Sequence, residues 1–69
     1  MTIEGCHAVL RAWGWTFIQP LHAGATLWMD RFGEKHWVPN LAPMTFDDRV
    51  EFLRLLAEQI GESIPAAAA

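Results

Sequence analysis

The side chains of this chain with the widest chemistry are a single cysteine and three histidines, Cys6, His7, His22 and His36. Thiolate and imidazole groups are preferred ligands of transition metals, so this set contains the right donors for a zinc centre. None of the four has the paired spacing of a zinc knuckle or of two histidines on one helical turn. We therefore predict no metal site and no cofactor, with Cys6 a small core residue, His7 at the surface and His22 in a loop.

Two adjacent carboxylates, Asp47 and Asp48, are the next group that could do chemistry. They follow Thr45 at the expected start of a helix, where acidic side chains bond to the first backbone N–H groups and suit the positive helix end. Capping accounts for both residues, so an acid/base pair is not needed to explain them. With no catalytic motif elsewhere, the sequence predicts a protein that is not an enzyme.

Composition limits the partners that this chain can have. The 69 residues carry a net charge of −3, and the five Lys and Arg residues are scattered, which disfavours a nucleic acid partner. One cysteine excludes an internal disulfide, and no leader or membrane-spanning run is evident, so we expect a cytoplasmic protein without membrane contact. The length predicts one domain over residues 1–64, followed by a frayed, Ala-rich tail over 65–69.

A helix is predicted first, beginning after Thr2 as cap and ending before Gly14. Its apolar residues recur at steps of three and four, the spacing of one helical face: Ile3, Cys6, Val9 or Leu10, and Trp13. Residues 15–18 are β-formers and lead to Pro20, which indicates a short first strand.

A hairpin is predicted next, from a strand over 25–30, a turn over 31–34 and a strand over 35–38. In the first of these strands Leu27 and Met29 point one way and Trp28 the other. A capped helix then runs to Gly61 with one apolar stripe: Phe46, Val50, Leu53, Ala57 and Ile60. The prediction is an α+β domain of order α-β-β-β-α, a three-stranded antiparallel sheet packed on two helices.

This element order, with Gly14-Trp15 and Val38-Pro39 at its corners, resembles the HicA-type toxins, small ribonucleases with a double-stranded-RNA-binding-like αβββα fold. The resemblance covers most of residues 3 to 61 and implies the fold. That family cuts RNA with a histidine after a Gly-Ser pair at the start of the second strand. Here the stretch is Gly24-Ala25-Thr26, with His22 before the glycine, and the family's basic surface is missing. The resemblance therefore implies the fold without the activity.

Four tryptophans in a chain of this size suggest a binding surface, because Trp is enriched at interfaces. If Leu27 and Met29 face the helices, Trp28 is exposed, and it has either His36 or Trp37 as its cross-strand neighbour. The last helix carries a second apolar stripe that a partner could cover: Phe52, Leu55, Leu56 and Gln59.

These features favour a non-enzymatic protein–protein interaction module, a small inhibitor or adaptor that forms a homodimer and binds another protein. Its predicted binding residues are aromatic, leucine and neighbouring polar side chains: Trp28, His36, Trp37, Phe52, Leu55, Leu56 and Gln59. The first alternative is a HicA-like RNA-binding ribonuclease or its inactive relative. The second is a metal-dependent regulator that uses Cys6 and the histidines.

Overall fold

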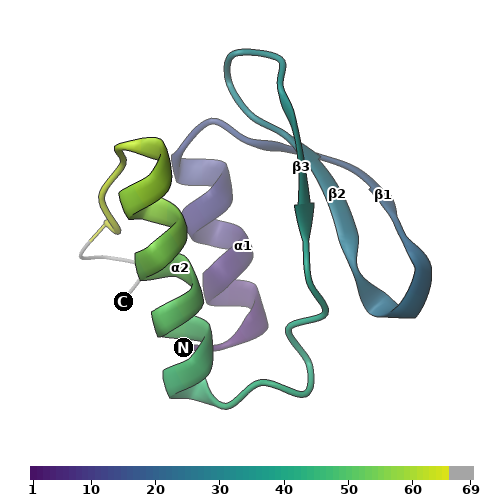
Figure 1. The fold of residues 1–69 in the computed structure, drawn as a ribbon, viewed down its shortest axis with the longest axis vertical. Coiled ribbons are helices and arrows are strands. Elements are labelled where there is room, and N and C mark those ends of the chain that lie inside the picture. Colours follow the sequence, from purple (N-terminus) through teal and green to yellow (C-terminus); the bar gives the residue numbers. More distant parts are fainter. Residues whose placement is uncertain (66–69) are drawn as a thin grey trace.

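The computed structural model describes residues 1–65, and the predicted tail over 65–69 lies, apart from Pro65, outside the described residues. The order of elements confirms the predicted α-β-β-β-α fold (Figure 1). The two helices lie together on one side of the sheet. The elements are α1 (Ile3–Ala12), β1 (Thr16–Pro20), a 3-10 turn (His22–Gly24), β2 (Thr26–Met29), β3 (Lys35–Val38) and α2 (Phe46–Ile60).

Helix α1 forms for the local reasons that its sequence suggests. The hydroxyl of Thr2 accepts a hydrogen bond of 2.9 Å from the backbone N–H of Gly5, which satisfies one of the free donors at the helix start. Gly14 follows the C-terminal cap with a φ of +86°, a conformation that only glycine adopts without strain. The face between these ends is buried at Cys6, Val9 and Leu10.

The three strands form an antiparallel sheet in the order β1-β2-β3. Trp28 in the central strand lies opposite Phe17 on one side and His36 on the other, so His36 is the cross-strand neighbour that the sequence left open. The register of β1 shifts between Phe17 and Gln19, where Ile18 forms a bulge. Residues directly opposite each other share a face, so this register assigns each strand residue to the helix side or the outer side.

Trp28 was expected to be exposed, and this prediction is wrong. Its side chain is only 1% exposed and packs towards α1, near the His7 ring and the Arg11 guanidinium. The indole N–H donates to the Thr26 hydroxyl at 2.9 Å, so the one polar atom of the ring stays bonded inside the core. Because Trp28 points towards the helices, the two sides of β2 are exchanged relative to the prediction. Leu27 and Met29 lie on the outer face of the sheet.

The ends of α2 match the sequence prediction, but its buried face is rotated. Thr45 and Asp48 form the capping box, with bonds of 3.1 and 3.3 Å, and Gly61 ends the helix with a φ of +72°. Leu53 and Ala57 are buried as expected, whereas Phe46 is 61% exposed and Val50 is 39% exposed.

Arg49 takes the place in the core that Phe46 and Val50 were expected to fill. Its guanidinium donates to three backbone carbonyls, those of Leu41 at 2.9 Å, Met1 at 3.2 Å and Ala42 at 3.3 Å. These bonds hold the loop before α2 and the start of the chain against the helix. They fix which face of its first turns points inwards.

The core lies between the helices and the inner face of the sheet. It consists mostly of side chains from α1, β2, β3 and α2: Cys6, Val9, Leu10, Trp13, Trp15, Trp28, Val38, Leu41, Leu53 and Ala57. Helices cover only one face of the sheet, so its other face is open. Across residues 1–65, no helix has the length and apolar character needed to cross a bilayer.

Candidate functional site

Two parts of the surface could bind a partner or a ligand. The first is the open side of the sheet. We call this the outer face and define it by the residues that the register places there: Thr16, Gln19, Leu27, Met29, Lys35 and Trp37. Trp37 lies opposite Leu27 and is 64% exposed. A large aromatic ring so exposed among aliphatic neighbours is typical of a contact surface.

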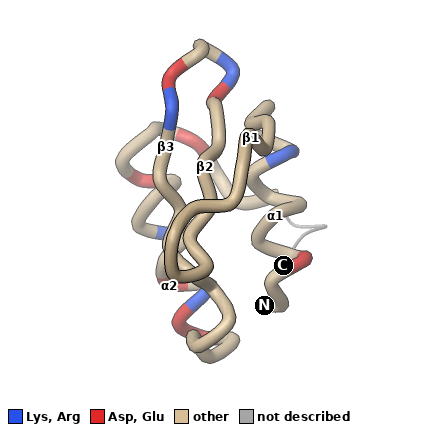
Figure 2. Tube along the Cα trace, turned by 90° about the vertical axis from the view of Figure 1, so that its right-hand side faces the viewer, with Lys and Arg blue, Asp and Glu red and all other residues tan. Residues whose placement is uncertain are grey.

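Charge is nearly absent from the outer face. Figure 2 looks onto the sheet and shows charged residues gathered in the hairpin loop and on the helices, with only the start of β3 charged among the strands. That residue is Lys35, opposite Met29 at the end of the sheet. The outer face therefore combines apolar side chains with uncharged polar ones and has one cation at its margin, although the chain as a whole has a net charge of −3.

The predicted binding residues do not form one surface. Trp37 lies on the outer face, whereas His36 alternates with it and points to the helix side with Trp28. On α2, Leu55 is 50% exposed, as a partner contact would require. Phe52 and Leu56 are half-buried and pack against the core.

The remaining predicted residue, Gln59, lines a pocket beside the hairpin loop, which is the second unusual part of the surface. This pocket has a volume of about 270 Å³. It lies between Trp13 and Trp15, the loop that joins β2 to β3, and the end of α2. We call it the hairpin pocket, and three of its side chains carry ligand-type groups: Asp30, Glu34 and His36.

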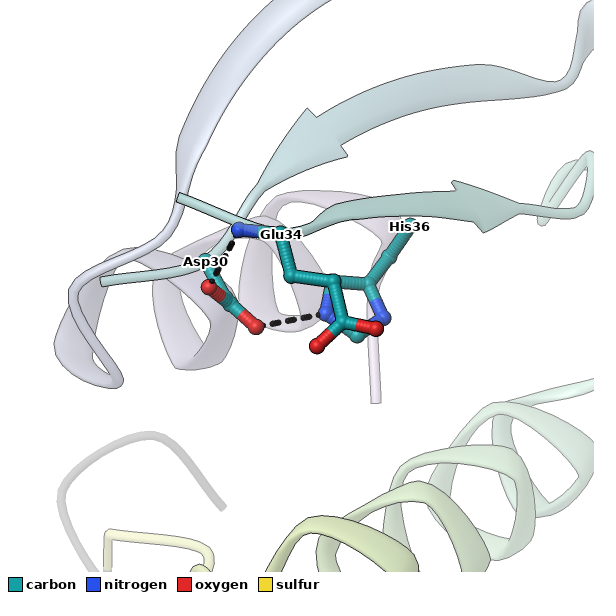
Figure 3. A group of neighbouring side chains, drawn as sticks. All are labelled: Asp30, Glu34 and His36. Atoms are coloured by element: carbon teal, nitrogen blue, oxygen red, sulfur yellow. Dashed lines mark hydrogen bonds and ion pairs between the residues drawn. The ribbon is translucent and has the colours of Figure 1, made fainter. Parts of the chain in front are cut away.

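Asp30 is the central residue of this group. One of its oxygens, Oδ1, accepts backbone N–H bonds from Phe32 at 2.8 Å and Glu34 at 2.9 Å, which folds the hairpin loop around the carboxylate. The other oxygen, Oδ2, lies 2.8 Å from Nε2 of His36 (Figure 3). The hydrogen bond with His36 lowers the pKa of Asp30, and the backbone bonds lower it further, so the carboxylate stays ionised.

His36 is held in place by an aromatic ring as well as by Asp30. Its imidazole stacks on the indole of Trp15, with 4.3 Å between ring centroids and 18° between planes. Trp15 in turn packs edge-on against Trp13, whose indole N–H donates to the carbonyl of Ser63 at 3.0 Å. Buried residues thus fix the position of the imidazole, which leaves one ring edge towards Asp30 and the pocket.

Glu34 and Arg31 complete the charged rim of the pocket. The ligand atoms of Asp30, Glu34 and His36 lie within 4.8 Å of one another, and Figure 3 shows the Glu34 carboxylate beside the imidazole. Arg31 forms an ion pair of 3.2 Å with Glu62 instead, linking the hairpin loop to the end of α2. Across residues 1–65, no hydrogen bond or ion pair holds the Glu34 carboxylate.

Apart from His36, the potential metal ligands considered from the sequence lie outside this group. Cys6 is buried in the core, where burial raises the pKa of its thiol. His7 is half-buried against Trp28 rather than at the surface as predicted, because α1 turns it towards the sheet. His22 is exposed in the 3-10 turn between strands, which confirms its loop position. Among residues 1–65, His36 is the one of the four that lies in a group of three potential metal ligands.

The sequence analysis missed Asp30 and Glu34, although a signal for them was present. Asp30 and Glu34 flank the hairpin turn, and their facing backbone groups are bonded at 2.8 Å. Once Trp28 points inwards, period-two alternation puts Asp30 and His36 on the same side of the sheet. The sequence left the cross-strand partner of Trp28 open between His36 and Trp37, so it did not bring His36 and Asp30 together.

We compared the chain with known proteins and found no match. Neither a protein-family model, a curated protein nor a solved structure matches the chain. The resemblance to HicA-type toxins accordingly stays a prediction from the sequence, and function has to be argued from the two surfaces described above.

Proposed function

We propose that this chain is a non-enzymatic protein-interaction module whose outer face binds a second copy of itself. The observation that carries the proposal is the open side of the sheet, where Trp37 is 64% exposed opposite Leu27. Leu27 and Met29 beside it are half-buried, so they form a floor into which a partner's side chains can pack.

Charge indicates which face two copies would bring together. Each chain has a net charge of −3, so two copies repel each other over most of their surface. The outer face carries Lys35 and no carboxylate, and it is the side on which two acidic molecules approach most easily.

The size of the outer face sets the strength of this contact. Strands of four or five residues, at about 3.3 Å per residue and 4.8 Å between strands, provide less than the roughly 800 Å² per partner of a standard interface. These dimensions give a footprint of about 200 Å² per partner, well below that of a standard interface, so the contact binds weakly. We therefore expect a reversible homodimer with a Kd on the order of micromolar.

The broader role in this proposal is that of a small inhibitor or adaptor in the cytoplasm. A single cysteine, buried and without a second thiol in the chain, suits a reducing compartment. Binding of another protein would use the same outer face, in competition with the second copy, because Trp37 is the most exposed large aromatic of the sheet.

Sedimentation equilibrium from about 1 to 200 µM tests the proposal. We expect the mass to rise from monomer to dimer, and Trp37→Ala to weaken dimerisation roughly 30-fold, the effect of removing an interface hot spot. Phe32→Ala is the matched control, because Phe32 is an even more exposed aromatic, 81%, but lies at the hairpin tip. It should leave the Kd unchanged.

Two results would contradict the outer-face dimer. A wild-type protein that stays monomeric at 200 µM has no such interface. If dimerisation survives Trp37→Ala but is lost in Leu55→Glu, the interface is the exposed side of α2. RNA cleavage that disappears in His22→Ala would instead support the HicA-like ribonuclease.

A further inference from the structure

The hairpin pocket brings together a ligand set that the proposed function does not use. Asp30, Glu34 and His36 come from the two ends of the hairpin loop and the start of β3, and their donor atoms lie within 4.8 Å of one another. We propose that these three side chains bind a divalent transition metal of the zinc class. The proposal does not depend on dimerisation, because the pocket is on the helix side of the sheet.

The charges of the group favour a cation. Two carboxylates lie side by side with one imidazole, and the nearest guanidinium, that of Arg31, is paired with Glu62. Lys35 is opposite Met29 and therefore shares its outer face. Negative charge is thus left at the mouth of the pocket, where a divalent ion would neutralise it.

The geometry of the group resembles a site held ready for an ion. Asp30 keeps Oδ2 directed at His36 because its other oxygen is fixed by two backbone N–H groups. Trp15 holds the imidazole flat at 4.3 Å. Outer contacts of this kind orient metal ligands and strengthen binding. The ion would lie between Nε2 of His36 and Oδ2 of Asp30 and replace their hydrogen bond, with Glu34 as the third ligand.

The donor types indicate which metal fits. One imidazole nitrogen and two carboxylate oxygens suit Zn²⁺ and its neighbours, whereas Mg²⁺ and Ca²⁺ prefer oxygen ligands alone. Three protein ligands leave one tetrahedral position for water or a small ligand, and the pocket of about 270 Å³ adjoins it. This arrangement differs from a structural zinc site, in which four protein ligands enclose the ion.

Isothermal titration of the full chain with ZnCl₂ tests the site. We expect one ion per chain with a Kd on the order of micromolar, and little binding of Mg²⁺. Glu34→Gln should weaken Zn²⁺ binding roughly tenfold or more. This variant keeps the fold, because the Glu34 side chain is exposed and its bonds to Asp30 are made by its backbone N–H and C=O. His36→Gln should abolish binding.

Glu58→Gln is the matched control, since Glu58 is an exposed acid of α2 that does not line the pocket, and its removal changes the net charge equally. Its Kd for Zn²⁺ should stay within about twofold of wild type. Co²⁺ gives a second readout, because a bound ion should quench Trp15 fluorescence and show visible absorption that disappears in His36→Gln.

The site is refuted if wild-type protein takes up no Zn²⁺ at 1 mM. It is equally refuted if Glu34→Gln and His36→Gln bind as wild type does. Binding that is lost in His7→Gln or His22→Gln would assign the ion to the other histidines.

Discussion

Arg49 shows how a single residue can organise this small fold. It is buried, yet across residues 1–65 it has no carboxylate partner, and its guanidinium is satisfied by the carbonyls of Leu41, Ala42 and Met1. The ring of Phe46 lies 5.6 Å from the guanidinium carbon and adds a cation–π contact. One planar group thus joins the chain start, the loop before α2 and the helix itself.

Arg49→Lys should lower the free energy of unfolding by about 1 to 3 kcal/mol, because an ammonium cannot reach three carbonyls in the fixed geometry of the guanidinium. Urea denaturation followed by circular dichroism measures the change. Arg54→Lys is the control, since Arg54 is exposed on α2 and bonds only to Glu51. Equal stability of the two variants would show that the three carbonyl bonds are not needed.

At the scale of elements, local signals predicted the ends of helices and strands well. Thr2, Thr45 and Gly61 act within one helical turn, so their effects can be predicted without knowing the rest of the fold. The inner and outer sides of β2 could not be predicted this way, because both Trp28 and the Leu27–Met29 pair are apolar. The orientation of β2 depends on the space between α1 and the sheet, which the Trp28 ring fills.

The contact between α1 and the sheet should make stability depend on pH. His7 lies 5.3 Å from the Trp28 ring, and its burial, aided by the nearby Arg11, lowers the pKa of His7 below its ordinary value of 6.5. Below pH 6.5 the unfolded chain therefore binds a proton at His7 more readily than the folded chain does. The contribution of His7 to stability is complete above pH 6.5 and is lost as the pH falls below it.

Urea midpoints measured between pH 5 and 7.5 test this dependence. His7→Gln should flatten the curve, since a neutral amide does not titrate. His22→Gln, at an exposed position in the 3-10 turn, should leave the curve as in wild type. The packing of His7 on the sheet would be contradicted if stability rose as the pH fell and His7→Gln removed that rise.

At the scale of the whole molecule, one hairpin carries both surfaces for which we propose a role. The outer face of its strands presents Trp37, Leu27 and Met29, while their inner side and loop present His36 and Asp30. The sequence singled out Trp37 as a contact residue, which stays a prediction, and it missed the pocket. The reason is that the pocket requires side chains from β1, the hairpin and α2 to meet, and their meeting depends on the assembled core.

Self-association through the outer face should also appear in the thermal stability of the whole protein. Dimerisation stabilises the folded state by mass action, so the Tm of wild type should rise with protein concentration, roughly 3 to 6 °C per tenfold for a domain of this size. Trp37→Ala should remove this dependence, since the exposed ring contributes to the contact and little to the core. Differential scanning calorimetry between about 5 and 500 µM measures both. A wild-type Tm that stays constant over this range would contradict dimerisation through the outer face.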